Sequence, residues 1–426
     1  MDISKIGLKV LHYVIYGPPV SAGYTIRTHS IVKAQKKQGL LPSVAISLKS
    51  LIGNYNTNLN FASKNIVNGI AYYSAHNELM NDPVFELISK LLMKNNRVSK
   101  HLKEKFYSFR NQKILSNYFN FISDDIGSID LIHAHVPSIA FNEAYFINKF
   151  LKKKIIYEVR GFWNLSLESF DKDMMNAVKD EVDACQKADK CIAICKGIAD
   201  VLIKGGISSD KIEIVPNGVD PDKFIIMDKD LNLSKSMKLD DKIIFGYVTS
   251  VRWFEGIQTM VKAWPKILKE IPNAIFLLIG DGNYLETIKD MIKEYDIENS
   301  FLALGRIQHD SISSYYSLID VFVVPRIDVP VSHIVTPLKP LEAMINRKPV
   351  VVSDVNALKE MVIDGETGLH FKADDHNHLA DVCIQLAKDS TLRDSLGNQA
   401  RNWVLENRTW EKIAGQYSEI YNKLLN

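Results

Sequence analysis

The stretch AIFLLIG, residues 274–280, consists of six apolar residues in a row followed by a glycine. A strand that is apolar on both faces is typical of parallel sheets that helices cover on both sides. Similar runs recur along the chain and alternate with longer segments of helical periodicity, which indicates βαβ units. The other runs are KVLHYVIY (9–16), PSVAISL (42–48), IDLIHAH (129–135), KIIYEVR (154–160), KCIAIC (190–195), KIEIVPN (211–217), KIIFGYV (242–248), FLALGRI (301–307), VFVVPR (321–326) and KPVVVSD (348–354).

The alternation of strands and helices runs twice, each time for about 200 residues, which is an ordinary domain size. A polar stretch, 221–241, follows the first run. The sequence therefore predicts two doubly wound, Rossmann-like α/β domains, over 1–220 and 221–407. The last segment, 408–426, has its apolar residues on one side and predicts a C-terminal helix. Residues 51–75 show little periodicity and fit either an active-site loop or a loosely ordered insertion.

The predicted fold indicates where a ligand would bind. Doubly wound sheets bind ligands at the carboxyl ends of their strands, beside helix N-termini. Two such domains that face each other create a cleft between them, and small-molecule sites are common in such clefts. We therefore expect functional side chains in the loops that follow the strands.

The composition is that of an ordinary soluble globular protein, with 46% hydrophobic and 24% charged residues in a chain of 426. The net charge of +2 argues against a general nucleic-acid-binding protein. The halves differ, because residues 1–220 contain 28 Lys and Arg against 21 Asp and Glu, a net charge of +7, and the remainder carries −5. This difference fits two modules with different surroundings.

The four cysteines are Cys185, Cys191, Cys195 and Cys383, and they show no CxxC pair and no metal-ligand spacing. We expect buried, reduced thiols in a cytoplasmic protein. The N-terminal apolar run is short, ends at Gly17 and does not predict a signal peptide. No apolar stretch approaches the ~20 residues that a membrane-spanning helix needs.

The stretch from Lys90 to Lys113 contains eight basic residues and one acidic residue, with apolar residues among them. A basic helix with an apolar face fits docking on an anionic membrane surface, which would place the protein at the inner face of the plasma membrane. A solvated basic face over an ordinary core explains the same pattern, so both interpretations stay open.

The stretch HIVTPLKPLEAM, residues 333–344, combines two prolines with a lysine and a glutamate. Pro340 predicts the first residue of a helix and so places Glu342 in the first turn. A carboxylate there complements the helix dipole by roughly 0.3–1 kcal/mol, which is one explanation of its presence. The backbone amides before the helix and the Lys339 ammonium would also suit a diphosphate, and Glu342 could accept hydrogen bonds from two ribose hydroxyls.

The stretch HAH, residues 133–135, ends an apolar strand, so both histidines lie on one face of that strand. A zinc site would need a third ligand, and none stands at a suitable spacing. A core histidine and a histidine that binds a ligand at the strand end both stay open. The loop 16–31 has glycines that permit close approach of a ligand but matches neither a dinucleotide fingerprint nor a P-loop.

Taken together, the motifs resemble glycosyltransferase family 4, retaining enzymes of the GT-B fold that use nucleotide-activated sugars. The resemblance spans nearly the whole chain, and a capsule and teichuronic-type branch shares VTPLKPLEAM. It rests on GYTIRTHSI (23–31), HAH (133–135), VPNGVD (215–220), GYVTSVRWFEG (246–256), IGDG (279–282), VTPLKPLEAM (335–344) and KPVVVSDVNALKEMVIDGETGLHF (348–371).

The resemblance implies roles for individual residues. Glu342 corresponds to the second glutamate of the family's Glu-x7-Glu motif, which binds the donor ribose, and His135 to the histidine that contacts the donor sugar near the reacting centre. These two are the candidate catalytic residues. The candidate donor-binding residues are Gly23, Arg252, Gly282, Arg306, Ile307, Arg326, His333, Thr336, Leu338, Lys339 and Glu342, and the candidate acceptor-binding residues in the first domain are Tyr24, Arg27 and Arg160.

Two features depart from the family pattern. The position of the motif's first glutamate is taken by Ile334, with His333 beside it. The arginine and lysine that usually hold the diphosphate correspond to Ser250 and Glu255. The nearest basic replacements are Arg252, Arg326 and Lys339.

The resemblance implies transfer of a sugar from a UDP- or GDP-sugar to a hydroxyl of a glycan or lipid-linked glycan, with retention, in surface polysaccharide synthesis. Cationic groups would stabilise the charge that grows on the departing diphosphate. The resemblance implies that no metal and no other cofactor is needed. It also implies a C-terminal helix that crosses back to the first domain. A nucleotide-sugar epimerase of the same fold and a non-catalytic nucleotide-sugar-binding protein are the alternatives.

Overall fold

The structure is a computed structural model that describes residues 7–18, 23–48, 62–75, 100–162, 174–224, 226–308 and 311–426, without the side chains of 100–111 and 174–177. The chain divides into two compact units. Unit 1 comprises Met1–Ile194, Ile198–Val215 and Ala414–Asn426, and unit 2 comprises Cys195–Gly197 and Pro216–Ile413. The main boundary between the units therefore lies at residue 216, whereas the sequence predicts it at 221.

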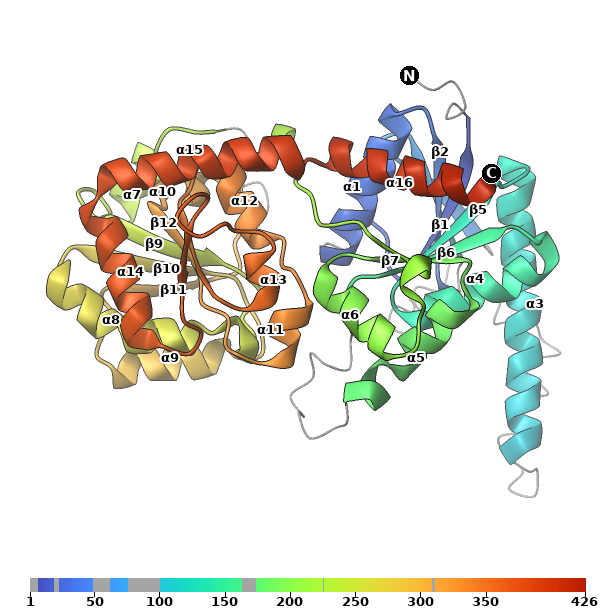
Figure 1. The fold of residues 1–426 in the computed structure, drawn as a ribbon, viewed down its shortest axis with the longest axis horizontal. Coiled ribbons are helices and arrows are strands. Elements are labelled where there is room, and N and C mark those ends of the chain that lie inside the picture. The colour runs from blue at the N-terminus through green and yellow to red at the C-terminus, as the bar shows by residue number, and fades with distance from the viewer. Residues whose placement is uncertain are drawn as a thin grey trace. The chain divides into compact units, whose positions relative to one another are not determined.

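Unit 1 is built on an eight-stranded sheet of order β3-β4-β2-β1-β5-β6-β7-β8 (Figure 1). Every neighbouring pair is parallel except β3 and β4. The strands are β1 (Lys9–Val14), β2 (Leu41–Ile46), β3 (Ala62–Val67), β4 (Ile70–Ala75), β5 (Leu131–His135), β6 (Lys154–Val159), β7 (Lys190–Ala193) and β8 (Ile212–Ile214). The helices are α1 (Gly23–Lys37), α3 (Lys100–Ile126), α4 (Ser138–Leu151), α5 (Met174–Lys187) and α6 (Lys196–Lys204).

The hairpin of β3 and β4 occupies 62–75, part of the segment for which periodicity predicts a loop or an insertion. Its turn is Asn68-Gly69, and both residues have positive φ, 52° and 72°. Asn-Gly is the pair that two-residue hairpin turns favour, because both positions need this backbone conformation. The dipeptide was thus the available signal for these two strands, and the expectation of irregular structure over 62–75 is wrong.

Unit 2 is built on a six-stranded, entirely parallel sheet of order β11-β10-β9-β12-β13-β14 (Figure 1). All six residues of β10 (Ala274–Ile279), the apolar run quoted first, are buried. The other strands are β9 (Ile243–Val248), β11 (Phe301–Gly305), β12 (Val321–Val324), β13 (Val350–Ser353) and β14 (Leu369–Phe371). The helices are α7 (Leu231–Ser236), α8 (Ile257–Glu270), α9 (Leu285–Glu294), α10 (Ile312–Leu318), α11 (Pro330–Ile334), α12 (Lys339–Ile345), α13 (Asn356–Lys359), α14 (His376–Lys388) and α15 (Ser390–Asn407). The predicted doubly wound α/β fold is confirmed in both halves.

The core of unit 2 is apolar and rich in aromatic residues. The ring of Trp264 in α8 meets Phe245, Phe276 and Phe301 edge to face, at centroid distances of 5.7–5.8 Å. This geometry places ring edges against ring faces and is worth more than the burial of area alone. The apolar packing holds β9, β10 and β11 against α8.

The loops at the carboxyl ends of β9 and β10 touch backbone to backbone. Gly280 has φ 137°, and a Cβ there would lie 1.7 Å from the carbonyl oxygen of Thr249. Only glycine tolerates both this conformation and this contact. The two loops are therefore fixed relative to each other at the edge of the sheet where ligands bind in doubly wound folds.

The final helix, α16 (Trp410–Leu425), joins unit 1 from Ala414 onwards. Its buried Tyr417 and Tyr421 have their hydroxyls within hydrogen-bonding distance of Arg27 and Gln35. The C-terminal helix therefore returns to the first domain, as predicted.

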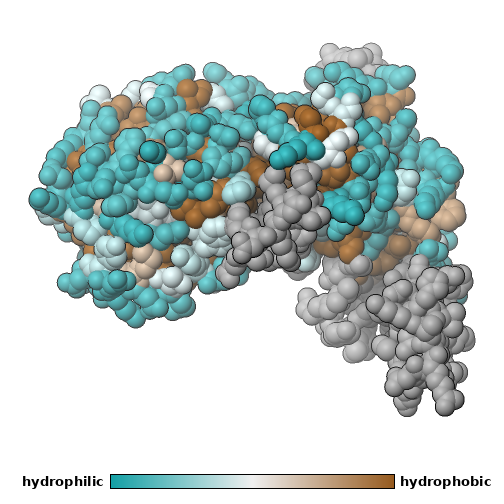
Figure 2. Space-filling model, turned by 60° about the horizontal axis from the view of Figure 1, so that its bottom comes forward, coloured by the Kyte–Doolittle hydropathy of each residue, from teal (hydrophilic) through white to brown (hydrophobic). Residues whose placement is uncertain are grey.

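The face of the molecule in Figure 2 is largely hydrophilic, with hydrophobic residues scattered over it. Among the described residues, no helix is both long and apolar enough to cross a membrane. The stretch 90–113, for which we expect either a membrane-docking or a solvated face, lies outside the described residues up to 99, and the side chains of 100–111 are not described.

Candidate functional site

The carboxylate of Glu342 lies in the first turn of α12 in unit 2, where the sequence places it. Its Oε2 accepts hydrogen bonds from Lys339 Nζ at 2.7 Å and from the Tyr316 hydroxyl at 3.0 Å. The side chain is 15% exposed. Among the described residues nothing donates to Oε1, so one carboxylate oxygen is held and the other is available.

The segment before α12 is more regular than its prolines suggest. Residues 330–334 form the short helix α11, which the sequence did not predict. The buried side chain of Thr336 and its own carbonyl both accept from Asn217 Nδ2, at 3.2 and 3.0 Å. His333 bonds Asp328 at 2.6 Å and accepts from the Asn356 amide at 3.1 Å. These contacts fix the loop that leads to Leu338 and Lys339.

Ile334, at the position where the family resemblance implies a glutamate, is buried, at 7% exposure. The Cys195 thiol donates to the Ile334 carbonyl at 2.8 Å, and a Cβ on Gly197 would lie 2.9 Å from the Cα of Ile334. The segment is thus tightly packed inside unit 2 and presents an apolar side chain there.

Arg326, which follows β12, forms a buried two-point ion pair with Glu255. Its Nη2 donates to Glu255 Oε1 at 2.8 Å and its Nε to Oε2 at 3.2 Å, while Nη1 donates to the Val335 carbonyl at 2.7 Å. Tyr247 also donates to Glu255. Burial is the largest influence and would lower the pKa of Arg326, but the charge of Glu255, the nearby Tyr247 and the hydrogen bonds to both together leave the pKa raised. Arg326 is therefore charged and already engaged.

Four further predicted donor-binding residues lie after strands of unit 2. Arg252 follows β9, Gly282 follows β10, and Arg306 and Ile307 follow β11; both arginines are exposed. A Cβ on Gly282 would lie 2.2 Å from the Val251 carbonyl oxygen, so this loop also packs against its neighbour. Because all these strands are parallel, the residues share one edge of the sheet.

In unit 1, buried polar side chains gather around Glu158 of β6. Its carboxylate accepts from Arg160 Nε at 2.6 Å, from Arg27 Nε at 3.1 Å and from the Tyr417 hydroxyl. Burial alone would raise the pKa of Glu158, but the two guanidiniums outweigh it and hold the pKa well below its ordinary value. Glu158 is therefore an ionised carboxylate inside the protein.

Three histidines belong to the same cluster. Nδ1 of His12, in β1, lies 2.9 Å from Nε2 of His135, in β5. The other ring nitrogen of His135, Nδ1, lies 2.6 Å from Arg160 Nη2. His133 Nδ1 lies 2.6 Å from the Tyr421 hydroxyl. Burial lowers the pKa of all three imidazoles, so they are neutral near pH 7.

His12 and Glu158 were missed by the sequence analysis, although a signal existed. Each is a polar residue inside an otherwise apolar strand, in KVLHYVIY and KIIYEVR. Buried polar groups need partners, so these two positions indicated an internal network. Parallel pairing of β1 with β5 and of β5 with β6 brings them together.

His12 is the third potential metal ligand, which the spacing in the sequence did not indicate. One ring nitrogen from each of His12, His133 and His135 lies within 4.8 Å of the others. Three imidazoles are a donor set that zinc or copper accepts. However, Arg27 and Arg160 lie in the same cluster, and Arg160 donates to His135. Two guanidiniums disfavour a further cation, and the expectation of a metal-independent protein stays a prediction.

The predicted acceptor-binding residues lie in this cluster or beside it. Arg27 and Arg160 are 2% and 4% exposed, and Arg160 Nη1 donates to the Tyr24 carbonyl at 2.9 Å. Gly23, the first residue of α1, is exposed. Contact of Arg27, Arg160 and Tyr24 with an acceptor stays a prediction, as does contact of His135 with a donor sugar.

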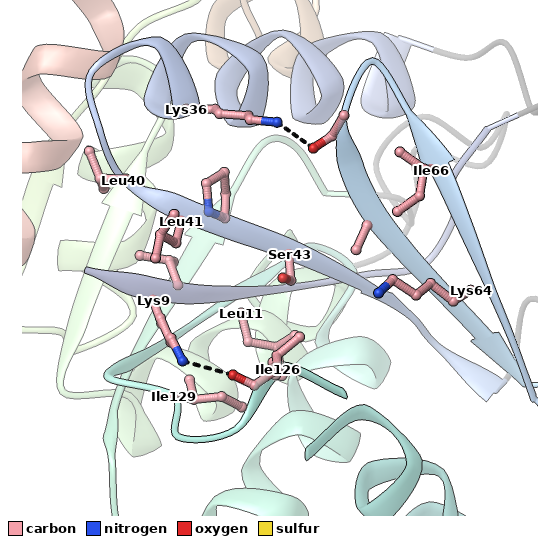
Figure 3. A pocket seen from close by; sticks show the side chains of 14 residues that line it. Lys9, Leu11, Lys36, Leu40, Leu41, Ser43, Lys64, Ile66, Ile126 and Ile129 are labelled. Carbon is pink, nitrogen blue, oxygen red and sulfur yellow. Dashed lines mark hydrogen bonds between the residues drawn. The ribbon is translucent and has the colours of Figure 1, made fainter. Parts of the chain in front are cut away.

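A cavity of about 300 Å³ lies at the other end of the unit 1 sheet, where β1 and β2 begin (Figure 3). Lys9 Nζ at its wall donates to the Ile126 carbonyl at the end of α3, and Lys36 Nζ donates to the Gly69 carbonyl. These two ammonium groups thus bind the end of a helix and the turn of a hairpin. None of the predicted site residues lines this cavity.

Comparison with known proteins identifies the class to which this chain belongs. Two family models match: Glycosyltransferase Family 4 over residues 93–223, and Glycosyl transferases group 1 over residues 228–403. Between them they cover well over half of the chain. The chain belongs to glycosyltransferase family 4 and has the GT-B fold.

Individual relatives agree with this assignment. An uncharacterised glycosyltransferase of Methanocaldococcus jannaschii is 26% identical over 284 residues, which is 65% of this chain and 70% of that protein. The capsular polysaccharide biosynthesis glycosyltransferase CapM of Staphylococcus aureus is 24% identical over 273 residues, 62% and 70% of the two chains. The structure of Anabaena HepE in complex with UDP and glucose matches with a TM-score of 0.71 and 16% identity, over 97% of this chain and 99% of that one, and so shares the fold.

Proposed function

We propose that the protein is a retaining glycosyltransferase that moves a sugar from a UDP- or GDP-sugar to a hydroxyl of a glycan or lipid-linked glycan. Membership of the family supports glycosyl transfer. The relative CapM, named for capsular polysaccharide biosynthesis, supports a surface polysaccharide as the product. The HepE complex with UDP and glucose supports a nucleotide-linked donor on this fold.

The observation that carries the proposal is the arrangement at Glu342. Tyr316 and Lys339 hold Oε2, so the carboxylate is oriented before any ligand arrives. A ribose has two adjacent hydroxyls, and the available Oε1 is the natural acceptor for one or both. The Lys339 ammonium beside it suits the diphosphate that follows the ribose in a sugar nucleotide.

The proposed mechanism assigns positive groups to the leaving diphosphate. Bond breaking at the anomeric carbon creates an oxocarbenium-like transition state, while negative charge grows on the diphosphate oxygen. Lys339 and the exposed Arg252 would stabilise that charge, because Arg326 is already paired with Glu255. The acceptor hydroxyl attacks from the face that the diphosphate leaves, and the diphosphate oxygen takes its proton, which gives retention without a metal.

Glu342→Gln tests the proposal because it keeps the shape and removes the charge. We expect donor affinity to fall about 10- to 100-fold, as for loss of hydrogen bonds to a charged group. The measurement is calorimetric titration with UDP, GDP and their sugars, combined with nucleotide release in the presence of a membrane extract. Glu286→Gln is a matched control, since Glu286 forms a similar 2.7 Å pair with Lys289 in the first turn of α9. Unchanged donor affinity in Glu342→Gln, or no nucleotide bound by the unmodified protein, would contradict the proposal.

One observation favours a second candidate, a nucleotide-sugar-binding protein without turnover. The apolar, buried Ile334 stands where the family resemblance implies a glutamate that touches the donor sugar. Donor binding without nucleotide release, with every acceptor preparation offered, would favour this candidate. Appearance of an epimer from the donor alone would instead indicate an epimerase of the same fold.

For the location we propose a cytoplasmic protein that is peripheral at the inner face of the membrane, where a lipid-linked acceptor would be reached. The basic stretch 90–113 supports the idea by its composition. Co-sedimentation with anionic liposomes at low salt is the measurement, and neutral liposomes are the control. Equal recovery with both kinds of vesicle would argue against membrane docking.

A further inference from the structure

We propose that seven buried residues of unit 1 form a closed ring of polar contacts with one proton arrangement, and that Gln35 and Tyr421 are positioning residues which act through this ring. The members, in order, are Arg160, His135, His12, Gln35, Tyr421, His133 and Glu158, and none is more than 4% exposed. The ring itself stands on geometry alone, whereas its role in positioning rests on the proposed function.

The proton order starts at Arg160, which can only donate. Its Nη2 lies 2.6 Å from His135 Nδ1, so that nitrogen accepts and the neutral His135 carries its proton on Nε2. His135 Nε2 then donates to His12 Nδ1 at 2.9 Å. His12 in turn must carry its proton on Nε2, which lies 2.8 Å from the amide oxygen of Gln35.

The second half of the ring continues in the same direction. The amide oxygen of Gln35 accepts from His12, so its amide nitrogen faces Tyr421 and donates to the hydroxyl at 2.9 Å. The Tyr421 hydroxyl therefore directs its own proton to His133 Nδ1, at 2.6 Å. His133 thus carries its proton on Nε2, which faces Glu158 Oε2 at 3.5 Å.

Closure of the ring explains an atom that otherwise looks orphaned. His133 Nε2 is buried and has no hydrogen-bond partner within the ordinary distance. In the proposed order this nitrogen bears a proton that points at an ionised carboxylate, which is favourable at 3.5 Å. A reversed tautomer at any of the three histidines would set two lone pairs or two protons against each other, and a buried polar group left without a partner is destabilising.

The ring reaches the region of the proposed substrate site through Arg160. The other end of this guanidinium, Nη1, donates to the Tyr24 carbonyl at 2.9 Å and to the Thr28 hydroxyl at 2.8 Å, both in the first turns of α1. The amino end of α1 stands at the carboxyl edge of the sheet, where substrates bind in this kind of fold. Gln35 and Tyr421 lie at the far side of the ring and touch no substrate. Through the ring and Arg160 they affect the position of the first turns of α1.

The proton order is tested by nitrogen-15 NMR of the histidine side chains at pH 7.5, with His→Gln substitutions used to assign the signals. We expect His12, His133 and His135 all to be neutral and protonated on Nε2. A histidine protonated on Nδ1, a doubly protonated one, or a metal bound to these nitrogens would overturn the ring. This measurement needs no turnover, so it stands apart from the proposed function.

The positioning role is tested by the kinetics of Tyr421→Phe and Gln35→Met. We expect each to lower kcat about 10- to 100-fold, as for a misplaced catalytic geometry, with the KM for the donor little changed. Since one break opens the ring, the double variant should lose less than the product of the two effects. Tyr118→Phe is the control, because Tyr118 is equally buried in unit 1 and its hydroxyl bonds the Tyr73 and Ile46 carbonyls outside the ring.

Three outcomes would overturn the positioning role. One is a kcat of Tyr421→Phe equal to that of Tyr118→Phe. Another is multiplicative effects in the double variant. The last is absence of turnover in the unmodified protein, which would also overturn the proposed function, while the NMR result would still decide whether the ring exists.

Discussion

Two carboxylates of this protein, Glu158 near the end of strand β6 in unit 1 and Glu342 in the first turn of helix α12 in unit 2, have different surroundings. Glu158 is fully buried and shared by two guanidiniums. Glu342 is 15% exposed and held on one oxygen by an ammonium and a phenol. The first has its interactions completed by the protein, whereas the second keeps an oxygen for a ligand. The comparison teaches that a carboxylate indicates a binding site only when its protein partners leave one of its oxygens without a hydrogen bond.

The largest effect on this comparison is expected from Glu158→Gln. It removes the charge that Arg27 and Arg160 share inside the protein, and breaking a buried pair in this way costs about 3–5 kcal/mol. We expect the free energy of unfolding to fall by that amount in urea denaturation. Glu181→Gln is the control, because Glu181 is also buried but bonds a phenol and a backbone amide. Equal losses in the two variants would show that the guanidiniums do not set the cost.

Acid should weaken unit 1 before unit 2. The pKa values of His12, His133 and His135 are lowered by burial, so the unfolded chain takes up protons at a higher pH than the folded one. Stability is therefore complete above about pH 6.5 and falls as the pH decreases below it, by up to about 1 kcal/mol per histidine between pH 6.5 and 5.5. The lowered pKa of Glu158 adds a further loss at still lower pH.

Hydrogen exchange followed by mass spectrometry at pH 7.5, 6.5 and 5.5 can separate the two units, after correction for the intrinsic exchange rate. We expect protection in β1, β5 and β6 to fall faster than in β9 and β10. The described residues of unit 2 include no buried histidine. A parallel decline of both units would remove the histidines as the cause.

The smallest effect is expected from Lys339→Met. Its pair with Glu342 is partly exposed, so we expect a change in stability of no more than about 1 kcal/mol. The donor should still bind through Glu342, while the diphosphate loses one cation, which raises the KM for the donor about 10-fold. Initial rates at varied donor concentration measure this. An unchanged KM would assign the diphosphate contact to Arg252 instead.

The strands and the position of Glu342 could be predicted from the sequence because both depend on neighbours along the chain. Six consecutive apolar residues in β10 require burial on both faces, and Pro340 favours the start of a helix. The hairpin of β3 and β4 was predictable as well, but its signal was the dipeptide Asn68-Gly69 rather than a period. Local chemistry decides these elements.

The partners of the buried charges could not be predicted. Glu255 and Arg326 lie 71 residues apart, and Tyr421 meets His133 across 288 residues. Such contacts depend on strand order and on which unit the final helix joins. For the same reason the third histidine of the unit 1 cluster stayed unseen, since His12 and His135 are adjacent only after β1 pairs with β5.

By itself, the sequence determined two doubly wound domains, because its apolar runs require buried strands. Its motifs carry the resemblance to a family of glycosyltransferases, and that resemblance implies the return of the last helix. Only the tertiary structure decided which polar residues form all their hydrogen bonds and ion pairs inside the protein and which stay available to bind a ligand. A side chain such as Arg326 or Glu342 has the same chemistry wherever it stands, but its burial and partners come from segments far away in the chain, and those set whether its charge is neutralised or offered to a ligand.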